Sequence, residues 1–269
     1  MDIASSAFFL MIDCTLMRSL YTFLRMKYRY LLYIEFLGTQ YAGWQKQPDQ
    51  TTIQEVIENV LEQVLQQRVS IYGQGRTDAG VHALYQVAHF DCNRQIDTYK
   101  LKYAFLGLLP RDIAVWDIKQ VKNNFHARFD ALERHYHYNI ITQPSAFFSD
   151  RAELILKNLD LQSMQKCSSS VIGKHDFRNF SKEDDRKNYI CSIKRSSWSK
   201  ENGALTFSIA ANRFLRHLVR RLVGTMIEVG LDKKSLKEFN LLLNDPNTSV
   251  TPHMAAAKGL TLTKVLYQD

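Results

Sequence analysis

The chain reads Tyr-Arg-Tyr-Leu-Leu-Tyr-Ile-Glu-Phe at residues 28–36. Apolar or aromatic side chains recur there at every second position, namely Tyr28, Tyr30, Leu32, Ile34 and Phe36. A period of two is typical of a β-strand that buries one face in the protein core. We therefore expect a strand over residues 27–37, and the segments after it indicate how its buried face is covered.

A helix is predicted shortly after this strand. Residues 38–49 contain two glycines and one proline, which favour a loop. Thr52 and Glu55 then have the spacing of a capping box, in which side chains satisfy free amides at a helix start. Apolar side chains follow with a period of about 3.6 residues, at Ile53, Val56, Ile57, Val60, Leu61, Val64 and Leu65. This helix is expected to lay one face on a sheet.

The rest of the chain alternates between strand and helix patterns. Strands are expected at residues 69–72, 84–90, 113–121, 133–141, 189–198, 204–210 and 260–267, and helices at residues 101–108, 161–172 and 214–229. Hairpins mixed with helices predict an α+β fold with antiparallel sheets flanked by helices. A short stretch at residues 122–125 separates an N-terminal domain, residues 27–125, from a C-terminal domain, residues 126–269.

Length and composition limit the functional classes. A chain of 269 residues suits two domains, at about 150 residues each. The formal net charge of +8 favours a polyanionic partner such as nucleic acid, because Lys and Arg that neutralise phosphates release condensed counterions. Four cysteines without a Cys-x-x-Cys pair indicate a reducing, cytoplasmic compartment. The sequence has no run of about 18 apolar residues, so no membrane-spanning helix is expected.

The first 26 residues do not fit the domain pattern. Residues 7–12 form a short apolar core, but Asp2 and Asp13 flank it where a signal peptide would carry Lys or Arg. Methionines recur at positions 1, 11, 17 and 26, and the strand pattern begins after the last of them. We therefore expect residues 1–26 to be a leader that stems from a misassigned upstream start.

A glycine-rich loop separates two of the expected strands. It reads Gly-Gln-Gly-Arg-Thr-Asp-Ala-Gly-Val-His from Gly73 to His82. The loop lacks the Gly-Lys-Ser/Thr ending of a P-loop, and Asp78 stands where a dinucleotide-binding loop needs its third glycine. A carboxylate there repels phosphate, so the loop presents an acid, and Arg76 two residues before it would favour the ionised form. Such an aspartate suits a nucleophile or base; the alternative is a turn in which Asp78 caps its own backbone.

The same loop resembles a known family. Gly-Arg-Thr-Asp-Ala-Gly-Val-His at residues 75–82 closely resembles the catalytic signature of the bacterial tRNA pseudouridine synthase A (TruA) family. Further matches are Tyr-Ala-Gly-Trp-Gln at 41–45, Phe-His-Ala-Arg-Phe at 125–129, Arg-His-Tyr at 134–136, Asn-Arg-Phe-Leu-Arg-His-Leu-Val-Arg at 212–220 and Lys-Gly-Leu at 258–260. The likeness therefore spans nearly the whole chain, from residue 26 to residue 267.

The resemblance implies a fold, an activity and roles for individual residues. It places Asp78 on the catalytic aspartate and Arg76 on the arginine that pairs with it. It places Tyr136 on the tyrosine that stacks on the target base, and Leu260 on an apolar residue that lines the pocket. The implied fold is the pseudouridine synthase fold, two ferredoxin-like-related α/β units with the active cleft between them. The family isomerises uridines at positions 38, 39 and 40 of the tRNA anticodon stem-loop, works as a homodimer, and uses neither metal nor cofactor.

The residues around two of these matches agree with an RNA substrate. On the strand expected at 133–141, Tyr136 shares a face with Arg134, Tyr138 and Ile140, whereas His135, His137 and Asn139 share the other, so Tyr136 is expected to point toward the apolar side. Near the helix expected at 214–229, arginines recur at helical spacings of three and four, at positions 213, 216 and 220. We expect a basic ridge on an amphipathic helix, in which Arg216 and Arg220 bind the substrate through its phosphates.

Other chemistries have to be weighed against this interpretation. His135 with His137, or Asp78 with His82, could hold a metal ion, but no third ligand at a suitable spacing accompanies either pair. Two other functions stay open: a noncatalytic tRNA-binding protein on the same scaffold, and a small-molecule hydrolase with Asp78 as nucleophile. The sequence also leaves open whether Asp78 attacks covalently or removes a sugar proton, and whether Tyr136 assists the loss of the C5 proton.

Overall fold

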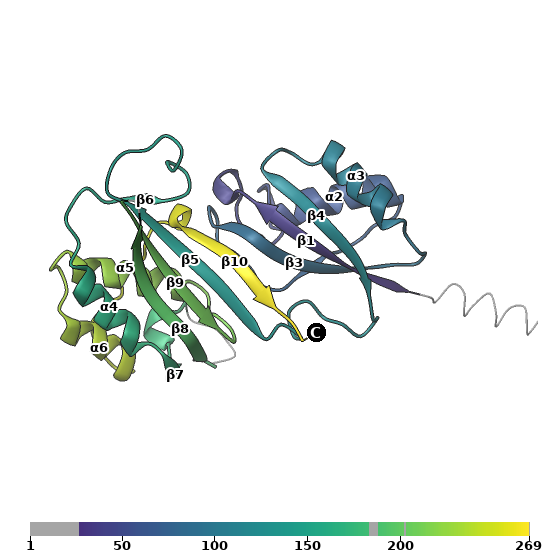
Figure 1. Ribbon diagram of the computed structural model, residues 1–269. Helices are drawn as coiled ribbons and strands as arrows, with labels where there is room; N and C mark the ends of the chain where they lie inside the picture. Colours follow the sequence, from purple (N-terminus) through teal and green to yellow (C-terminus); the bar gives the residue numbers. More distant parts are fainter. Residues whose placement is uncertain (1–26, 183–187, 202, 269) are drawn as a thin grey trace, which may run out of the picture.

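The computed structural model describes residues 27–182, 188–201 and 203–268, with strands in the middle and helices at both ends (Figure 1). The expected leader, residues 1–26, lies outside the described residues, so its origin stays a prediction. The predicted division into domains at residue 125 also stays a prediction, because the sheet runs on across that point.

One mostly antiparallel sheet of ten strands runs through the described part of the chain, in the main order β4-β1-β3-β10-β5-β9-β8-β7. Its N-terminal half contains β1 (Tyr28–Phe36), β3 (His82–Cys92) and β4 (Ile113–Val121). Its C-terminal half contains β5 (Glu133–Ile141), β7 (Gly173–Asp176), β8 (Ile190–Glu201) and β9 (Ala204–Ala211). The short strands β2 (Tyr72–Gly73) and β6 (Glu153–Leu154) pair with β3 and β5.

The last strand, β10 (Leu260–Leu266), joins the two halves. It pairs parallel with β3 and antiparallel with β5, and Figure 1 shows it in yellow between them. The expected α+β fold with antiparallel pairing flanked by helices is confirmed. The two expected sheets are fused into one, because β10 satisfies strand edges of both halves that would otherwise lack partners.

The helices form two groups at opposite ends of the sheet (Figure 1). The N-terminal half carries α2 (Ile53–Leu65) and α3 (Thr98–Leu108). The C-terminal half carries α4 (Leu161–Ser170), α5 (Leu218–Gly230) and α6 (Leu236–Asn244). Short 3-10 turns at Gly38–Gln40, Arg178–Phe180 and Ala257–Gly259 complete the fold. The strands β10 and β5 run between the two helix groups.

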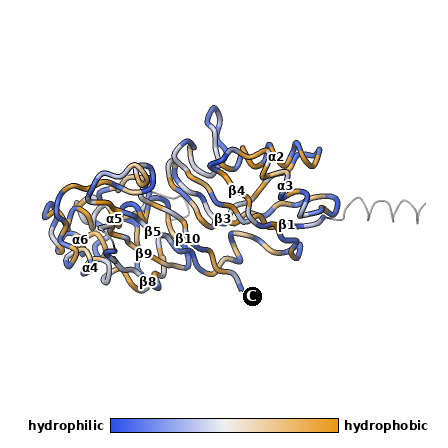
Figure 2. Tube along the Cα trace, turned by 45° about the horizontal axis from the view of Figure 1, so that its top comes forward, coloured by the Kyte–Doolittle hydropathy of each residue, from blue (hydrophilic) through white to orange (hydrophobic). Residues whose placement is uncertain are grey.

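Hydrophobic residues (orange) are concentrated along the strands and helices, and hydrophilic ones (blue) in the loops (Figure 2). The core is contiguous across both halves, with Trp44 and Tyr30 among the largest buried side chains on one side and Tyr138 and Phe207 on the other. Among the described residues, no helix is long and apolar enough to cross a membrane.

The predicted start of α2 is confirmed. The Thr52 hydroxyl accepts a hydrogen bond from the Glu55 amide at 3.4 Å, which satisfies one of the free amides at the helix start. The strand expected at 69–72 is wrong in extent, since only Tyr72 and Gly73 pair with β3. Ile71 instead bonds through its backbone to side chains of α2, because Glu58 accepts from its amide and Gln54 donates to its carbonyl.

The helix expected at 214–229 begins later, at Leu218. Two local features hold the preceding segment out of a helix. The Asn212 side chain accepts hydrogen bonds from the amides of Ser192 and Arg213, both at 2.9 Å. His217 adopts a left-handed backbone with φ of 67°. Of the three arginines expected on a helical ridge, only Arg220 therefore lies in a helix, and the ridge is not formed as predicted.

Candidate active site

The loop between β2 and β3 carries Asp78 and is called the acid loop below. It is anchored to the loop that precedes α2. The Trp44 amide donates to the Thr77 carbonyl at 3.2 Å. Gly43 has a positive φ of 94°, and a Cβ at this position would lie 2.5 Å from the Thr77 carbonyl oxygen. Only glycine allows the two loops to approach this closely. The matched stretch at residues 41–45 thus packs against the backbone of the acid loop and helps to fix its position.

His82 fixes the other end of the acid loop. Its side chain is 2% exposed; Nδ1 accepts from the Gly38 amide at 3.0 Å, and Nε2 lies 3.1 Å from the Lys258 carbonyl oxygen. Burial lowers the pKa of His82, so the ring is neutral and Nε2 is the donor. Both ring nitrogens therefore bond to backbone, which leaves His82 no lone pair for a metal ion beside Asp78.

Asp78 is held by two residues from the distant end of the chain. One carboxylate oxygen accepts a hydrogen bond from Nη1 of Arg220 at 3.2 Å, and the other lies 3.7 Å from Nε2 of His217. The Asp78 side chain is 25% exposed and that of Arg220 13% exposed. The Asp78 side chain is therefore largely shielded from solvent.

Arg220 is itself fixed by the segment before β10. Its Nε donates to the Ala255 carbonyl at 2.9 Å, and the Ala255 amide donates back to the Arg220 carbonyl at 3.0 Å. This contact requires Gly224 on α5, because a Cβ there would lie 2.5 Å from the His253 carbonyl oxygen. These contacts with Ala255 thus fix the position from which the Arg220 guanidinium bonds to Asp78.

Arg76 does not pair with Asp78 as expected. It is exposed, and no ion pair joins it to Asp78 in the described part of the chain. The pairing arginine is Arg220, 142 residues away in sequence. Proximity along the chain was misleading here, because the Arg76 side chain is exposed to solvent while Arg220 on α5 contacts Asp78.

The aromatic and apolar residues expected at the site lie on one face of the sheet. Tyr136 on β5 is 9% exposed, and its ring meets Phe214 edge to face at 5.2 Å between centroids. Burial raises the pKa of Tyr136, and the charge of Asp78 acts in the same direction. Leu260 pairs with Tyr138 across the β10–β5 ladder, so its side chain lies on the same face as that of Tyr136. The structure thus places Leu260 on the sheet face of Tyr136 and places Asp78 close enough to act electrostatically on Tyr136.

Tyr138 lies opposite Leu260 in the β10–β5 ladder. Its hydroxyl donates to Glu153 and lies 2.9 Å from the Ala256 carbonyl oxygen, and burial raises its pKa. A Cβ on Gly259 would lie 2.5 Å from Cζ of this ring, so only glycine fits above it. The matched Lys-Gly-Leu stretch therefore has a steric reason for its glycine.

The comparisons with known proteins agree with this geometry. A family model described as tRNA pseudouridine synthase matches residues 32–130 and 168–268. A tRNA pseudouridine synthase A of Chlorobium luteolum is 40% identical over 240 residues, which cover 88% of this chain and 95% of that protein. The chain belongs to the tRNA pseudouridine synthase family.

Two further relatives named tRNA pseudouridine synthase A extend this result. The protein of Azobacteroides pseudotrichonymphae is 37% identical over 242 residues, covering 90% of this chain and 97% of the relative. The protein of Bacteroides thetaiotaomicron is 38% identical over 245 residues, covering 90% and 91%. The family expected from the acid loop is thus confirmed.

Two residues of this tRNA pseudouridine synthase site were not identified from the sequence. His217 contacts Asp78, and burial lowers the pKa of its ring although Asp78 opposes this effect. Arg134 is 9% exposed and donates to Gln74 in the acid loop and to the carbonyls of Ala131, Arg128 and Asn212. Both lie inside matched stretches, but their contacts depend on the folded chain.

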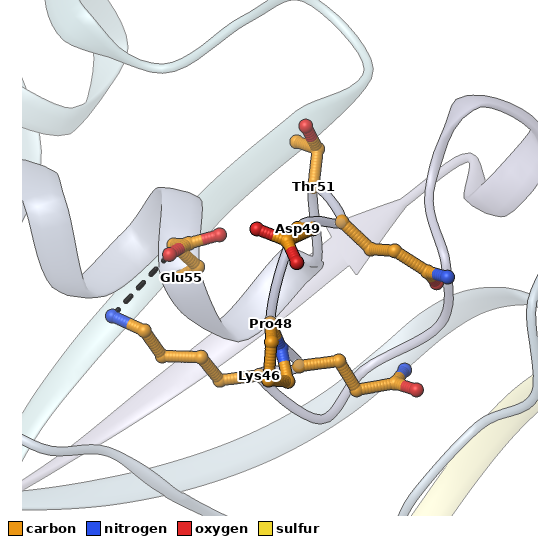
Figure 3. A pocket seen from close by; sticks show the side chains of 7 residues that line it. Lys46, Pro48, Asp49, Thr51 and Glu55 are labelled. Atoms are coloured by element: carbon orange, nitrogen blue, oxygen red, sulfur yellow. Dashed lines mark ion pairs between the residues drawn. The ribbon is translucent and has the colours of Figure 1, made fainter.

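The two pairs of residues considered as metal ligands, His135 with His137 and Asp78 with His82, gain no third ligand among the described residues. Among the described residues, no three His, Cys, Asp or Glu side chains are grouped so that they could hold a metal ion. His135 lies 2.7 Å from a carboxylate oxygen of Glu133. A surface hollow of about 520 Å³ is lined by the loop before α2, and Lys46 and Glu55 at this hollow form an ion pair of 3.4 Å. Figure 3 shows the side chains that line the hollow and marks this ion pair with a dashed line. All its lining residues come from this one loop and the first turn of α2, and it does not contain Asp78.

Proposed function

We propose that this protein isomerises uridine to pseudouridine at positions 38, 39 and 40 of the tRNA anticodon stem-loop, and that it does so in the cytoplasm. The observation that carries the proposal is the arrangement at the sheet centre. A carboxylate from the N-terminal half, Asp78, meets a guanidinium from the C-terminal half, Arg220, beside the ring of Tyr136. The family and its named relatives support the reaction class.

The reaction breaks the C1'–N1 glycosidic bond and forms a C1'–C5 bond with the same base. The proton lost from C5 is balanced by a proton gained at N1, so no co-reactant is consumed. The detached base must turn without escaping, which requires an enclosed site. The target nucleotide therefore leaves its stack and enters the protein, at a cost of about a few kcal/mol that contacts with protein offset.

Each side chain then has a part in the proposal. Arg220 orients Asp78 through a charge-assisted hydrogen bond. Covalent attack and removal of a sugar proton both begin from the Asp78 carboxylate. The Tyr136 hydroxyl is protonated at neutral pH as in any tyrosine, and burial raises its pKa further, so the ring stacks on the base as a neutral group. Leu260 closes the apolar wall, and the exposed Arg76 and Arg216 contact phosphates.

The test is tritium release from tRNA labelled at C5 of uridine, with site mapping of the product. The wild type releases tritium and converts uridines 38–40. Asp78→Asn abolishes release while tRNA affinity stays within about threefold. Asp49→Asn, the same change in the neighbouring loop, is the matched control and stays active. If Asp78→Asn retains a comparable rate, Asp78 is not the catalytic residue.

Two rival functions predict different outcomes. A noncatalytic tRNA-binding protein binds tRNA and releases no tritium. A small-molecule hydrolase turns over a nucleoside or sugar phosphate without RNA. Conversion at uridines outside positions 38–40 would contradict the proposed target while leaving the reaction in place.

The protein acts as a homodimer in this proposal. An aromatic cluster on the N-terminal half supports it: Tyr33, Tyr85 and Trp116 have ring centroids 5.1 to 5.7 Å apart, and Trp116 is 38% exposed. Partly exposed aromatic residues are enriched in protein interfaces. Sedimentation velocity should give the mass of a dimer for the wild type and of a monomer for Trp116→Glu. A wild-type monomer at micromolar concentration contradicts the dimer.

A further inference from the structure

The loop between β5 and β6, residues 142–152, exposes two neighbouring phenylalanines. Phe147 is 81% exposed and Phe148 50% exposed. Figure 1 shows this loop standing out from the sheet next to β6. Exposed aromatic side chains side by side are unfavourable in water unless they have a partner. Neither the catalytic arrangement around Asp78 nor the core gives these two rings a role.

The loop is held in one conformation by its own hydrogen bonds. The amides of Arg151 and Ala152 donate to the Phe148 carbonyl at 3.1 and 3.0 Å, and the Ser149 hydroxyl donates to the Ala146 carbonyl at 3.1 Å. A guanidinium nitrogen of Arg151 also donates to the Phe147 carbonyl at 2.6 Å. The two rings are therefore presented by an ordered turn, which lowers the entropy lost when they bind a partner.

The loop is also tied to the active site. Lys258 donates from Nζ to the Ser149 carbonyl at 2.8 Å, and its own carbonyl bonds to His82, which ends the acid loop. Glu153, directly after the loop, accepts a hydrogen bond from Tyr138 below Leu260. The loop that carries Phe147 and Phe148 is therefore bonded to the segments that hold Leu260 and the end of the acid loop.

Two cationic side chains, Arg151 and Lys258, belong to this loop or bond to it. The Arg151 guanidinium lies 5.9 Å from the centroid of Phe148, and Lys258 is bonded within the loop. Aromatic rings beside Lys and Arg are typical of surfaces that bind single-stranded nucleic acid, because bases stack on the rings while cations contact the phosphates. A protein-docking surface has few charged residues in its centre. Leu154 and Leu156 are also exposed nearby, so a protein partner is the competing outcome.

We propose that Phe147 and Phe148 stack on unpaired bases of the tRNA anticodon loop near the extruded uridine, with Arg151 and Lys258 on the adjoining phosphates. This rests on the proposed function. The rings act on binding and not on bond exchange, because the loop touches the substrate outside the pocket formed by Asp78, Tyr136 and Leu260. The RNA thus enters the site only after its neighbouring bases are held.

The experiment compares Phe147→Ala/Phe148→Ala with the wild type on full-length tRNA. We expect KM to rise about tenfold or more, since base stacking on an aromatic ring is lost at two positions, with kcat within about twofold. Leu106→Ala, which truncates an 80% exposed side chain on α3, is the matched control and keeps the wild-type KM. An unchanged KM in the double phenylalanine variant overturns the proposal.

Two further measurements separate stacking from apolar docking. Phe147→Leu/Phe148→Leu keeps apolar bulk without aromatic rings and is expected to raise KM like the alanine pair; wild-type KM in this variant overturns stacking. 2-Aminopurine placed beside the target position should be quenched on binding to the wild type and not to the alanine pair. Because quenching reports binding alone, it tests this proposal even if the wild type forms no pseudouridine. Equal quenching by both proteins overturns it, as expected if the loop docks another protein.

Discussion

Replacement of Arg220 by alanine is expected to lower kcat by about 100-fold. Arg220 donates to Asp78 at 3.2 Å, and the two side chains are only 13% and 25% exposed. Two unit charges about 4 Å apart in such a setting attract each other by about 4 kcal/mol. The exposed part of the carboxylate lets water recover some of this interaction, which leaves about 2 to 3 kcal/mol of lost positioning, or about 100-fold in rate.

The assay is single-turnover tritium release at saturating enzyme, which reports the chemical step apart from tRNA binding. Arg220→Lys keeps the charge, but the compact ammonium lacks the planar guanidinium that places one nitrogen on Asp78 and another on the Ala255 carbonyl, so an intermediate loss is expected. Arg216 is exposed and lies four residues before Arg220. Arg216→Ala therefore removes an equal charge and serves as the control for the chemical step. A single-turnover rate for Arg220→Ala within about threefold of the wild type would refute the reasoning.

Three further predictions concern binding, packing and pH. Arg216→Ala should weaken tRNA binding and reduce the slope of log K against log salt by about 0.7 to 0.9 if it removes one phosphate contact; an unchanged slope places Arg216 outside the interface. Gly259→Ala should displace the Tyr138 ring, lower kcat/KM and reduce the free energy of unfolding by about 1 to 3 kcal/mol in denaturant titrations, whereas wild-type values would show that the ring can yield. Glu133 accepts hydrogen bonds from Lys194 and Arg195, which hold its pKa below the ordinary glutamate value. The stabilisation that ionised Glu133 contributes to the fold is therefore complete at pH values above the ordinary glutamate pKa, and it is lost as the pH falls through the lowered pKa. The Glu133→Gln variant should unfold with a free energy about 1 to 3 kcal/mol below that of the wild type at neutral pH, and this difference should vanish in acid. A difference that persists in acid contradicts the charge-based account.

Much of the fold could be predicted from local patterns. The alternation at residues 28–36 and the helical period after Thr52 report which face of each segment is buried, and both are confirmed as β1 and α2. The start of α5 could not be predicted in this way, because the arginines continue a helical spacing through a segment whose backbone is bent. The Asn212 side chain and the left-handed His217 produce that bend, and hydropathy carries no sign of either.

The candidate site divides along the same line. The sequence by itself determined the family and the acid loop with Asp78, since both are recorded in contiguous residues. Only the tertiary structure decided which cation holds that acid. Arg76 is two residues away but exposed, whereas Arg220 is 142 residues away and in contact. The physical reason is that β10 inserts between β3 and β5 and draws the segment before it against α5, and such a long-range contact leaves no periodic signal along the chain.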